Sequence, residues 1–162
     1  ISHRPGEVVF ANASRTTVSS SCVSPANTST AASAVAALAA TGNGKVLAVM
    51  LADNPTFAES AMTAASIMAQ NNVWYPYVEM ADDASLKGLP AQLRMNAIAS
   101  HGGTTKANFE AFSLAASIVG KCHFCVKAHY DGLKKMGYTV EQLRDIGRIA
   151  SVMNSVAKVL NS

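Results

Sequence analysis

Apolar residues recur at every third or fourth position through the last third of the chain. This spacing predicts three successive helices, over residues 107–119, 122–136 and 139–160, with a glycine at each break. Thr139 and Gln142 have the T-x-x-Q spacing of a capping box, so they mark where the last helix begins. The pattern of that helix is carried by Val140, Leu143, Ile146, Ile149, Met153, Val156 and Leu160.

The pattern upstream is also helical. We expect helices over residues 31–40, 45–52, 57–71 and 86–99, the last with Pro90 near its first turn. No comparable alternation of polar and apolar residues predicts a β-strand. The expected fold class is therefore all-α, a compact bundle of about eight helices.

The start of the chain differs from the rest. Residues 1–30 are weakly patterned and rich in Ser and Thr, whereas residues 31–162 carry the helical pattern. We therefore divide the chain into an N-terminal segment and one helical domain. Within the domain, aromatic residues cluster at 74–77, where we expect them to anchor one helix against another rather than to stack on a ligand.

Composition narrows the possible functions. Only 14% of the residues are charged, against about 25% in ordinary globular chains, which indicates surface hidden in an oligomer, a surface of Ser, Thr and Ala, or both. The formal net charge of +3 is scattered, so no nucleic-acid partner is expected. The longest run of small apolar residues, 31–40, is well short of the ~18 residues of a membrane span. We expect a cytoplasmic protein, with a leader ahead of Ile1 left open.

Four residues near the first of the C-terminal breaks indicate chemistry. Cys122 and Cys125 form a C-x-x-C motif, and His129 follows four residues later. Glu110 stands twelve residues before the first cysteine. It is the only charged residue in the apolar stretch 107–120, which favours a functional carboxylate over a solvated one.

The first two of these helices would meet as a hairpin at Gly120. Glu110 precedes this glycine by ten residues and His129 follows it by nine, so each lies roughly 14–15 Å from the turn. The carboxylate and the imidazole can therefore be neighbours. The cysteines continue the row, because Cys125 lies one helical turn from His129 and Cys122 one turn further.

Such a row can activate a thiol. A thiolate, not a thiol, attacks peroxides and disulfides. The start of a helix, the lysines at 121 and 127 and an imidazole all favour the thiolate form of Cys125 or Cys122. Glu110 can orient and charge His129, directly or through water.

Other interpretations of C-x-x-C-x-x-x-H fit less well. Zinc would need a further ligand, and no second C-x-x-C or H-x-x-x-H pair is present. A structural disulfide across so short a loop would constrain the unfolded chain little. A thioredoxin fold lacks its βαβ context, and no glycine-rich phosphate loop follows a strand, so neither flavin nor nucleotide is expected. A redox-active dithiol without a metal is favoured. The spare candidates for a metal ligand are His3, Cys22, His101 and His123.

Glu110, Cys122, Cys125 and His129 fit the pattern E-x(11)-C-x-x-C-x-x-x-H without a gap. On this motif the chain resembles the AhpD (alkyl hydroperoxidase D) family of the carboxymuconolactone decarboxylase superfamily. The likeness covers roughly residues 30–162. It includes the segments 67–68, 71–73, 93–96 and 106–110.

The resemblance implies an all-helical subunit, commonly a homotrimer, that reduces alkyl hydroperoxides or a partner AhpC-type peroxiredoxin. No cofactor would be tightly bound, and dihydrolipoamide on a lipoyl-bearing dihydrolipoamide acyltransferase would be the reductant. By the same resemblance, Cys125 attacks the peroxide and forms a sulfenic acid, which Cys122 resolves as a disulfide. Glu110 and His129 would form the proton relay.

The chain departs from the family at two places. Phe124 stands where the family usually has a histidine, and His123 precedes it, so we expect His123 at the surface. Cys22 lies in the poorly matching N-terminal segment and is interpreted as an incidental thiol. Two other functions stay open: a lactone decarboxylase, as elsewhere in the superfamily, which would not need two cysteines, and a non-enzymatic redox-sensing adaptor whose disulfide alters a partner interface.

Overall fold

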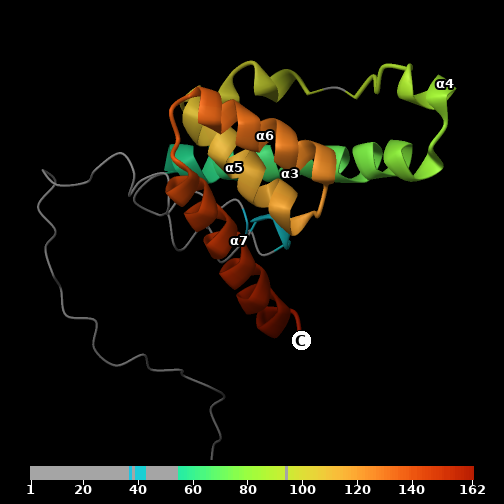
Figure 1. Ribbon diagram of the computed structural model, residues 1–162. Coiled ribbons are helices and arrows are strands. Elements are labelled where there is room, and N and C mark those ends of the chain that lie inside the picture. The colour runs from blue at the N-terminus through green and yellow to red at the C-terminus, as the bar shows by residue number, and fades with distance from the viewer. Residues whose placement is uncertain (1–36, 38, 43–54, 94) are drawn as a thin grey trace, which may run out of the picture.

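The described part of the chain is built from helices alone (Figure 1). The computed structural model describes residues 37, 39–42, 55–93 and 95–162. These residues form five α-helices, α3 to α7, and two short 3-10 helices, η1 and η2, which confirms the all-α class. The predicted helix over 45–52 and the segment 1–30 lie outside the described residues, as do most of the residues of the predicted helix over 31–40.

Helix α3, Pro55–Ala81, is longer than the pattern predicts. The expected end at Asn71 is wrong, because the helix continues through the aromatic cluster and past Pro76. A proline removes one backbone hydrogen bond from a helix interior, and packing against other helices offsets that loss. The side chain of Asn72 provides one such contact, because its amide Nδ2 donates to the backbone oxygen of Ala116 at 3.2 Å.

The predicted helix over 86–99 is wrong. Helix α4 covers only Ala84–Lys87, with the carboxylate of Asp83 accepting from the first backbone N–H groups. Gly88 ends it, and Pro90 disfavours helical dihedrals in the residue before it. Two 3-10 helices follow further along, η1 at Asn96–Ile98 and η2 at His101–Gly103.

The three C-terminal helices are confirmed nearly to the residue: α5 is Lys106–Val119, α6 is His123–Lys135 and α7 is Val140–Leu160. The capping box is present, because the side chain of Thr139 accepts from the backbone of Gln142 and the Gln142 side chain accepts from the backbone of Thr139.

Helix α5 is the centre of the bundle, in contact with α3, α6 and α7 (Figure 1). Its near-continuous apolar sequence follows from that position, since a helix surrounded by others buries most of its faces. Small buried residues on α3, among them Ala61, Ala64 and Ala65, allow α3 and α5 to pack closely. The buried residues of α5 are Phe109, Ala111, Phe112, Ser113, Leu114, Ala115, Ala116 and Ser117.

At the turn between α5 and α6, the side chain of Asn72 fills the space where a side chain on Gly120 would lie. A Cβ atom on Gly120 would lie 2.0 Å from Nδ2 of Asn72, so only glycine fits there. The next residue, Lys121, has a φ of 55°, in the left-handed region. This turn places the start of α6 against the end of α5.

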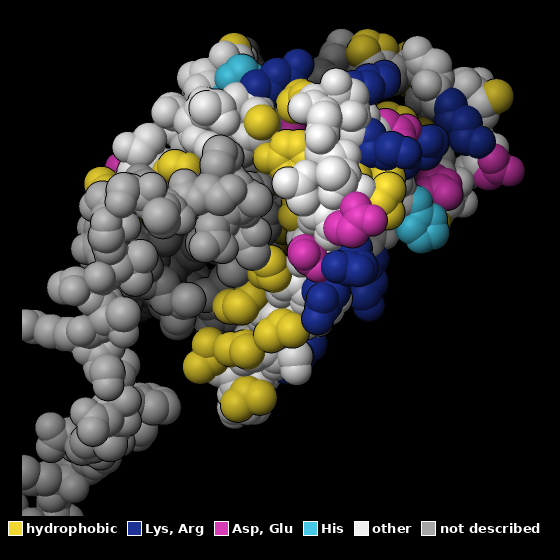
Figure 2. Space-filling model, turned by 60° about the vertical axis from the view of Figure 1, so that its left-hand side comes forward, with side chains coloured by type: hydrophobic (Ala, Val, Ile, Leu, Met, Phe, Trp, Pro, Cys, Tyr) yellow, Lys and Arg dark blue, Asp and Glu magenta, His cyan; other side chains and the backbone are white. Residues whose placement is uncertain are grey.

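Helix α7 extends beyond the other helices and carries an apolar stripe toward its C-terminal end (Figure 2). The exposed members of the stripe are Val152, Val156, Val159 and Leu160. Of the helices that the structure describes, none is long and apolar enough to span a membrane.

Candidate active site

A disulfide joins Cys122 and Cys125 at the start of α6, with 5.3 Å between their Cα atoms. Cys122 is the N-cap of the helix, and its Sγ accepts from the backbone N–H of Cys125 at 3.2 Å. Both residues are buried, with 0% and 3% of their surface exposed. The N-terminal end of a helix favours negative charge, so this position favours a thiolate when the pair is reduced.

Glu110 of α5 and His129 of α6 face each other across the hairpin. Nδ1 of His129 donates to Oε2 of Glu110 over 2.7 Å. The contact expected from their spacing around Gly120 is therefore present. Both side chains are largely shielded, with 23% and 18% of their surfaces exposed, so the pair is less screened by water than a surface ion pair.

The hydrogen bond from His129 lowers the pKa of Glu110 below its usual range. Partial burial opposes this effect, because desolvation disfavours a charged carboxylate. Electrostatic interactions with His129, Lys106 and His101 make smaller contributions that also lower the pKa of Glu110. Glu110 is therefore a carboxylate at neutral pH and serves as the acceptor for the imidazole.

Met68 completes the surroundings of the imidazole. Its Sδ lies 3.2 Å from Nε2 of His129, the nitrogen that does not face Glu110. Met68 is one of the buried residues of α3, with 1% of its surface exposed. No local signal indicated that this residue reaches His129, because the two are 61 positions apart.

The two pairs are linked along α6 rather than by a direct hydrogen bond. In the described part of the chain, the hydrogen-bond partners of the His129 ring are Glu110 and Met68, and neither cysteine is among them. Cys125 and His129 are four residues apart on the same helix, which places them on one face a turn apart.

The residues between the cysteines point outward. The side chain of His123 is 85% exposed, as expected, and its Nδ1 lies 4.0 Å from Oε1 of Glu79. Phe124 stacks on Tyr75 of α3, with ring centroids 4.3 Å apart and planes at 26°. The predicted anchoring role of the aromatic cluster is thus confirmed for Tyr75.

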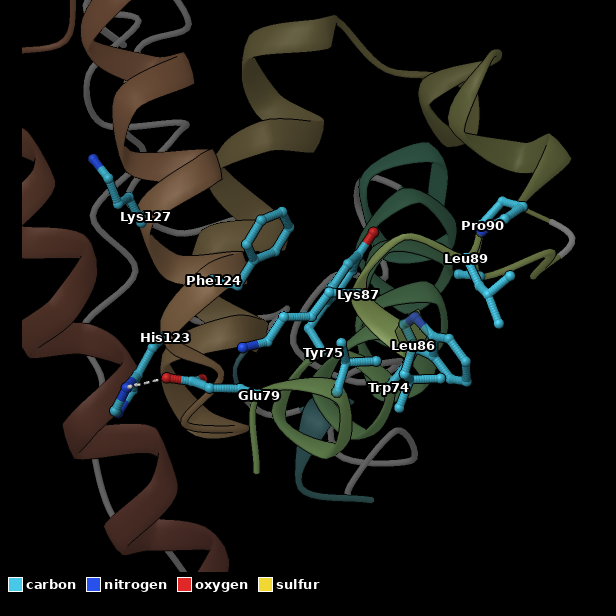
Figure 3. A pocket seen from close by; sticks show the side chains of 12 residues that line it. Trp74, Tyr75, Glu79, Leu86, Lys87, Leu89, Pro90, His123, Phe124 and Lys127 are labelled. Atoms are coloured by element: carbon cyan, nitrogen blue, oxygen red, sulfur yellow. Dashed lines mark ion pairs between the residues drawn. The ribbon is translucent and has the colours of Figure 1, made fainter. Parts of the chain in front are cut away.

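A pocket of about 660 Å³ opens next to His123 and Phe124, the two residues between the cysteines (Figure 3). Its walls come from the end of α3, the region of α4 and the start of α6. It is lined by Trp74, Tyr75, Val78, Glu79, Leu86, Lys87, Leu89, Pro90, Ala91, His123, Phe124 and Lys127.

Candidate metal ligands do not gather here. Across residues 55–93 and 95–162, together with the few described before them, no three His, Cys, Asp or Glu side chains come together to hold a metal ion. His3 and Cys22 lie outside the described residues.

Comparison with known proteins places the site in a family. Residues 85–162 match the model of the carboxymuconolactone decarboxylase family, a range that contains all four site residues. The alkyl hydroperoxide reductase AhpD of Brucella canis is 40% identical over 126 residues, which are 78% of this chain and 67% of that protein. The chain belongs to the AhpD group of the carboxymuconolactone decarboxylase family.

A second AhpD relative has a similar sequence identity to this chain over a shorter stretch. The alkyl hydroperoxide reductase AhpD of Coxiella burnetii is 42% identical over 101 residues, which are 62% of this chain and 56% of that protein. This AhpD-family chain therefore spans between about half and two thirds of the length of these relatives.

Proposed function

We propose that this chain is a thiol peroxidase that reduces alkyl hydroperoxides through a dithiol–disulfide cycle of Cys122 and Cys125. The observation that carries the proposal is the disulfide at the start of α6 with a carboxylate–imidazole pair one turn further along the same helix. The name of its AhpD relatives supports the choice of an alkyl hydroperoxide as substrate.

The cycle begins with both cysteines reduced. The Cys125 thiolate attacks one oxygen of the hydroperoxide, the O–O bond breaks, and the alcohol leaves after taking up a proton. Cys125 is then a sulfenic acid. Cys122 attacks its sulfur, the disulfide forms and water leaves. One hydroperoxide and two thiols thus give one alcohol, one water and one disulfide.

The surrounding groups assist each step. Glu110 holds the imidazole of His129 so that its other nitrogen can take the proton of Cys125 and later return one to the leaving alcohol. Cys122, as the N-cap, receives a backbone N–H on its sulfur, which favours it as the departing thiolate when the disulfide is reopened.

We further propose dihydrolipoamide as the reductant, carried on a lipoyl-bearing acyltransferase, and an AhpC-type peroxiredoxin as an alternative oxidised substrate. Two thiols of dihydrolipoamide reopen the disulfide by exchange and leave as the cyclic disulfide lipoamide, so that no tightly bound cofactor is required. These partners come from the resemblance of the chain to AhpD proteins.

The assembly is proposed to be a homotrimer. The support from the structure is the exposed apolar stripe of Val152, Val156 and Val159 on α7, together with the low overall charge. Light scattering of the purified chain measures the mass directly, and a monomer at micromolar concentration would contradict the proposal.

A turnover assay tests the activity. Peroxide consumption should require dihydrolipoamide and should be lost in both Cys125→Ser and Cys122→Ser, while mass spectrometry of the wild type after peroxide treatment should show the Cys122–Cys125 disulfide. The proposal fails if Cys125→Ser keeps wild-type turnover.

The same variants separate the two other functions. A lactone decarboxylase would still release CO₂ from its substrate in Cys125→Ser, because that chemistry does not need the dithiol. A redox-sensing adaptor would consume one peroxide per protein and stop, with dihydrolipoamide present or absent.

A further inference from the structure

Two serines of α5 carry buried hydroxyl groups without partners. Ser113 and Ser117 each have 0% of their surface exposed. Among the described residues, neither Oγ atom has a hydrogen-bond partner. A buried hydroxyl without a partner destabilises a fold, because it has given up its hydrogen bonds to water. The two hydroxyls are therefore candidates for a bond that forms in another state of the protein.

The serines lie on the face of α5 that meets α6. A helix turns by about 100° per residue, so Ser113 is rotated by about 60° from Glu110, and Ser117 by about 20°. Glu110 faces α6, because its carboxylate accepts a hydrogen bond across the hairpin. Nearer the turn, the backbone N–H of Cys122 donates to the backbone oxygen of Ser117 at 3.3 Å. Ser117 is thus level with Cys122, and Ser113 lies one helical turn further from the loop, as Cys125 does on α6.

The sulfur of Cys122 already contacts the peptide backbone on two sides. Its Sγ accepts from the backbone N–H of Cys125 at 3.2 Å and lies 3.9 Å from the backbone oxygen of Asn71 on α3. A disulfide sulfur has no hydrogen to donate, so this oxygen gains a further donor only when Cys122 is a thiol. The surroundings of Cys122 therefore offer a bond that the disulfide form cannot make.

Reduction changes what the two sulfurs need from their surroundings. A disulfide takes up two electrons and two protons to become two thiols, and one of the thiols can then lose a proton to leave a thiolate. A thiolate is charged and requires hydrogen-bond donors, above all where water has little access. Cys122 and Cys125 have 0% and 3% of their surface exposed, so these donors must come largely from the protein.

We propose that Ser117 and Ser113 donate their hydroxyl hydrogens to the sulfurs of Cys122 and Cys125 in the dithiol form and lose these bonds in the disulfide form. The inference rests on the proposed dithiol–disulfide cycle, since it names residues that regulate that same site. Because the hydroxyls are satisfied in one redox state alone, they favour the dithiol and make the disulfide easier to reduce. They are positioning residues, because they act through the sulfurs and do not touch the substrate.

The redox equilibrium tests the inference without any peroxide. The protein, in a Cys22→Ser background, is equilibrated with mixtures of reduced and oxidised dithiothreitol, and mass spectrometry after alkylation measures the fraction of disulfide. For half reduction, Ser117→Ala should need a ratio of reduced to oxidised dithiothreitol that is roughly 10-fold higher, because the dithiol alone loses a hydrogen bond to a charged group. A tenfold change corresponds to about 30 mV for a two-electron couple. Ser113→Ala should shift the ratio in the same direction.

Thermal unfolding of the two redox forms gives an independent readout. In the disulfide form, Ser117→Ala removes a hydroxyl without a partner and introduces a better helix former, so the Tm should stay the same or rise. In the dithiol form, the same variant should lower the Tm by roughly 3–6 °C. A merely structural role for Ser117 would change the Tm of both forms alike.

Ser151→Ala is the matched control. Ser151 is an exposed residue of α7 whose hydroxyl donates to the backbone oxygen of Gly147 at 2.8 Å, so its removal should leave the redox equilibrium unchanged. An unchanged or lower ratio in both Ser117→Ala and Ser113→Ala would overturn the inference. A disulfide that dithiothreitol does not reduce would overturn both the inference and the proposed cycle. The expected shifts in a protein without peroxidase activity would overturn the proposed function alone.

Discussion

The thioether sulfur of Met68 lies 3.2 Å from Nε2 of His129, on the side of the ring opposite Glu110. A thioether accepts a hydrogen bond but cannot donate one. Since Nδ1 carries the hydrogen that faces Glu110, Nε2 gains a bond to Met68 only when it takes up a proton. In the proposed relay, Met68 would therefore stabilise the ring after it has taken a proton from a thiol, as a positioning residue.

Replacing Met68 with leucine should slow the reaction of the reduced protein with iodoacetamide at neutral pH by roughly 2- to 10-fold, because the net value of one hydrogen bond is about 0.5–1.5 kcal/mol. The difference should vanish at alkaline pH, where the thiol ionises without a base. Met62→Leu is the control, since Met62 is 42% exposed on the same helix. A loss of rate that is equal at every pH would contradict the role of Met68.

Glu110 should make stability depend on pH in the acid range. Its pKa is lowered in the folded protein, so its contribution is present above the ordinary value of 4.5 and is lost as the pH falls through the folded value. Urea unfolding of the wild type and Glu110→Gln should differ by about 1 kcal/mol at neutral pH, and the gap should close below that ordinary value. A gap that widens on acidification would show that the carboxylate is destabilised by burial instead.

The roles of the two cysteines can be separated by trapping the sulfenic acid. In a Cys22→Ser background, one equivalent of peroxide should give a dimedone adduct at Cys125 in the Cys122→Ser variant. The Cys125→Ser variant should give no adduct, because Cys122 is then present without its attacking partner. An adduct at Cys122 alone would reverse the assignment and make the N-cap cysteine the attacking group.

The turn between α5 and α6 should tolerate no side chain. Gly120→Ala places a Cβ against the amide of Asn72 without changing an ordinary backbone conformation, so it should destabilise the protein by about 1–3 kcal/mol. Asn72→Ala in the same chain should recover part of that loss. Gly132→Ala is the control, since its Cβ would meet Oε2 of Glu110 at an ordinary 3.5 Å, and it should stabilise α6 by up to about 1 kcal/mol.

The features that the sequence predicts correctly depend on residues that are close together along the chain. The position of Glu110 opposite His129 follows from helical rise and one glycine, and both residues lie within a single hairpin. The pattern does not predict the part of α3 beyond Asn71, because Asn71 and Pro76 disfavour a helix, whereas contacts with α5 and α6 support the helix there.

Two further differences between prediction and structure concern the segment 86–99 and the surroundings of His129. Apolar spacing over residues 86–99 predicts a helix, but Gly88 and Pro90 do not allow it, and α4 ends after four residues. The contact between Met68 and His129 joins segments 61 positions apart, and a periodic pattern shows which face of a helix is buried without showing against what.

The burial of Cys122 and Cys125 affects which thiols can exchange with their disulfide. Exchange requires physical access to sulfur, and both sulfurs belong to residues with almost no exposed surface. The rate of exchange with this pair therefore depends on how well a donor can reach the sulfurs as well as on its reduction potential.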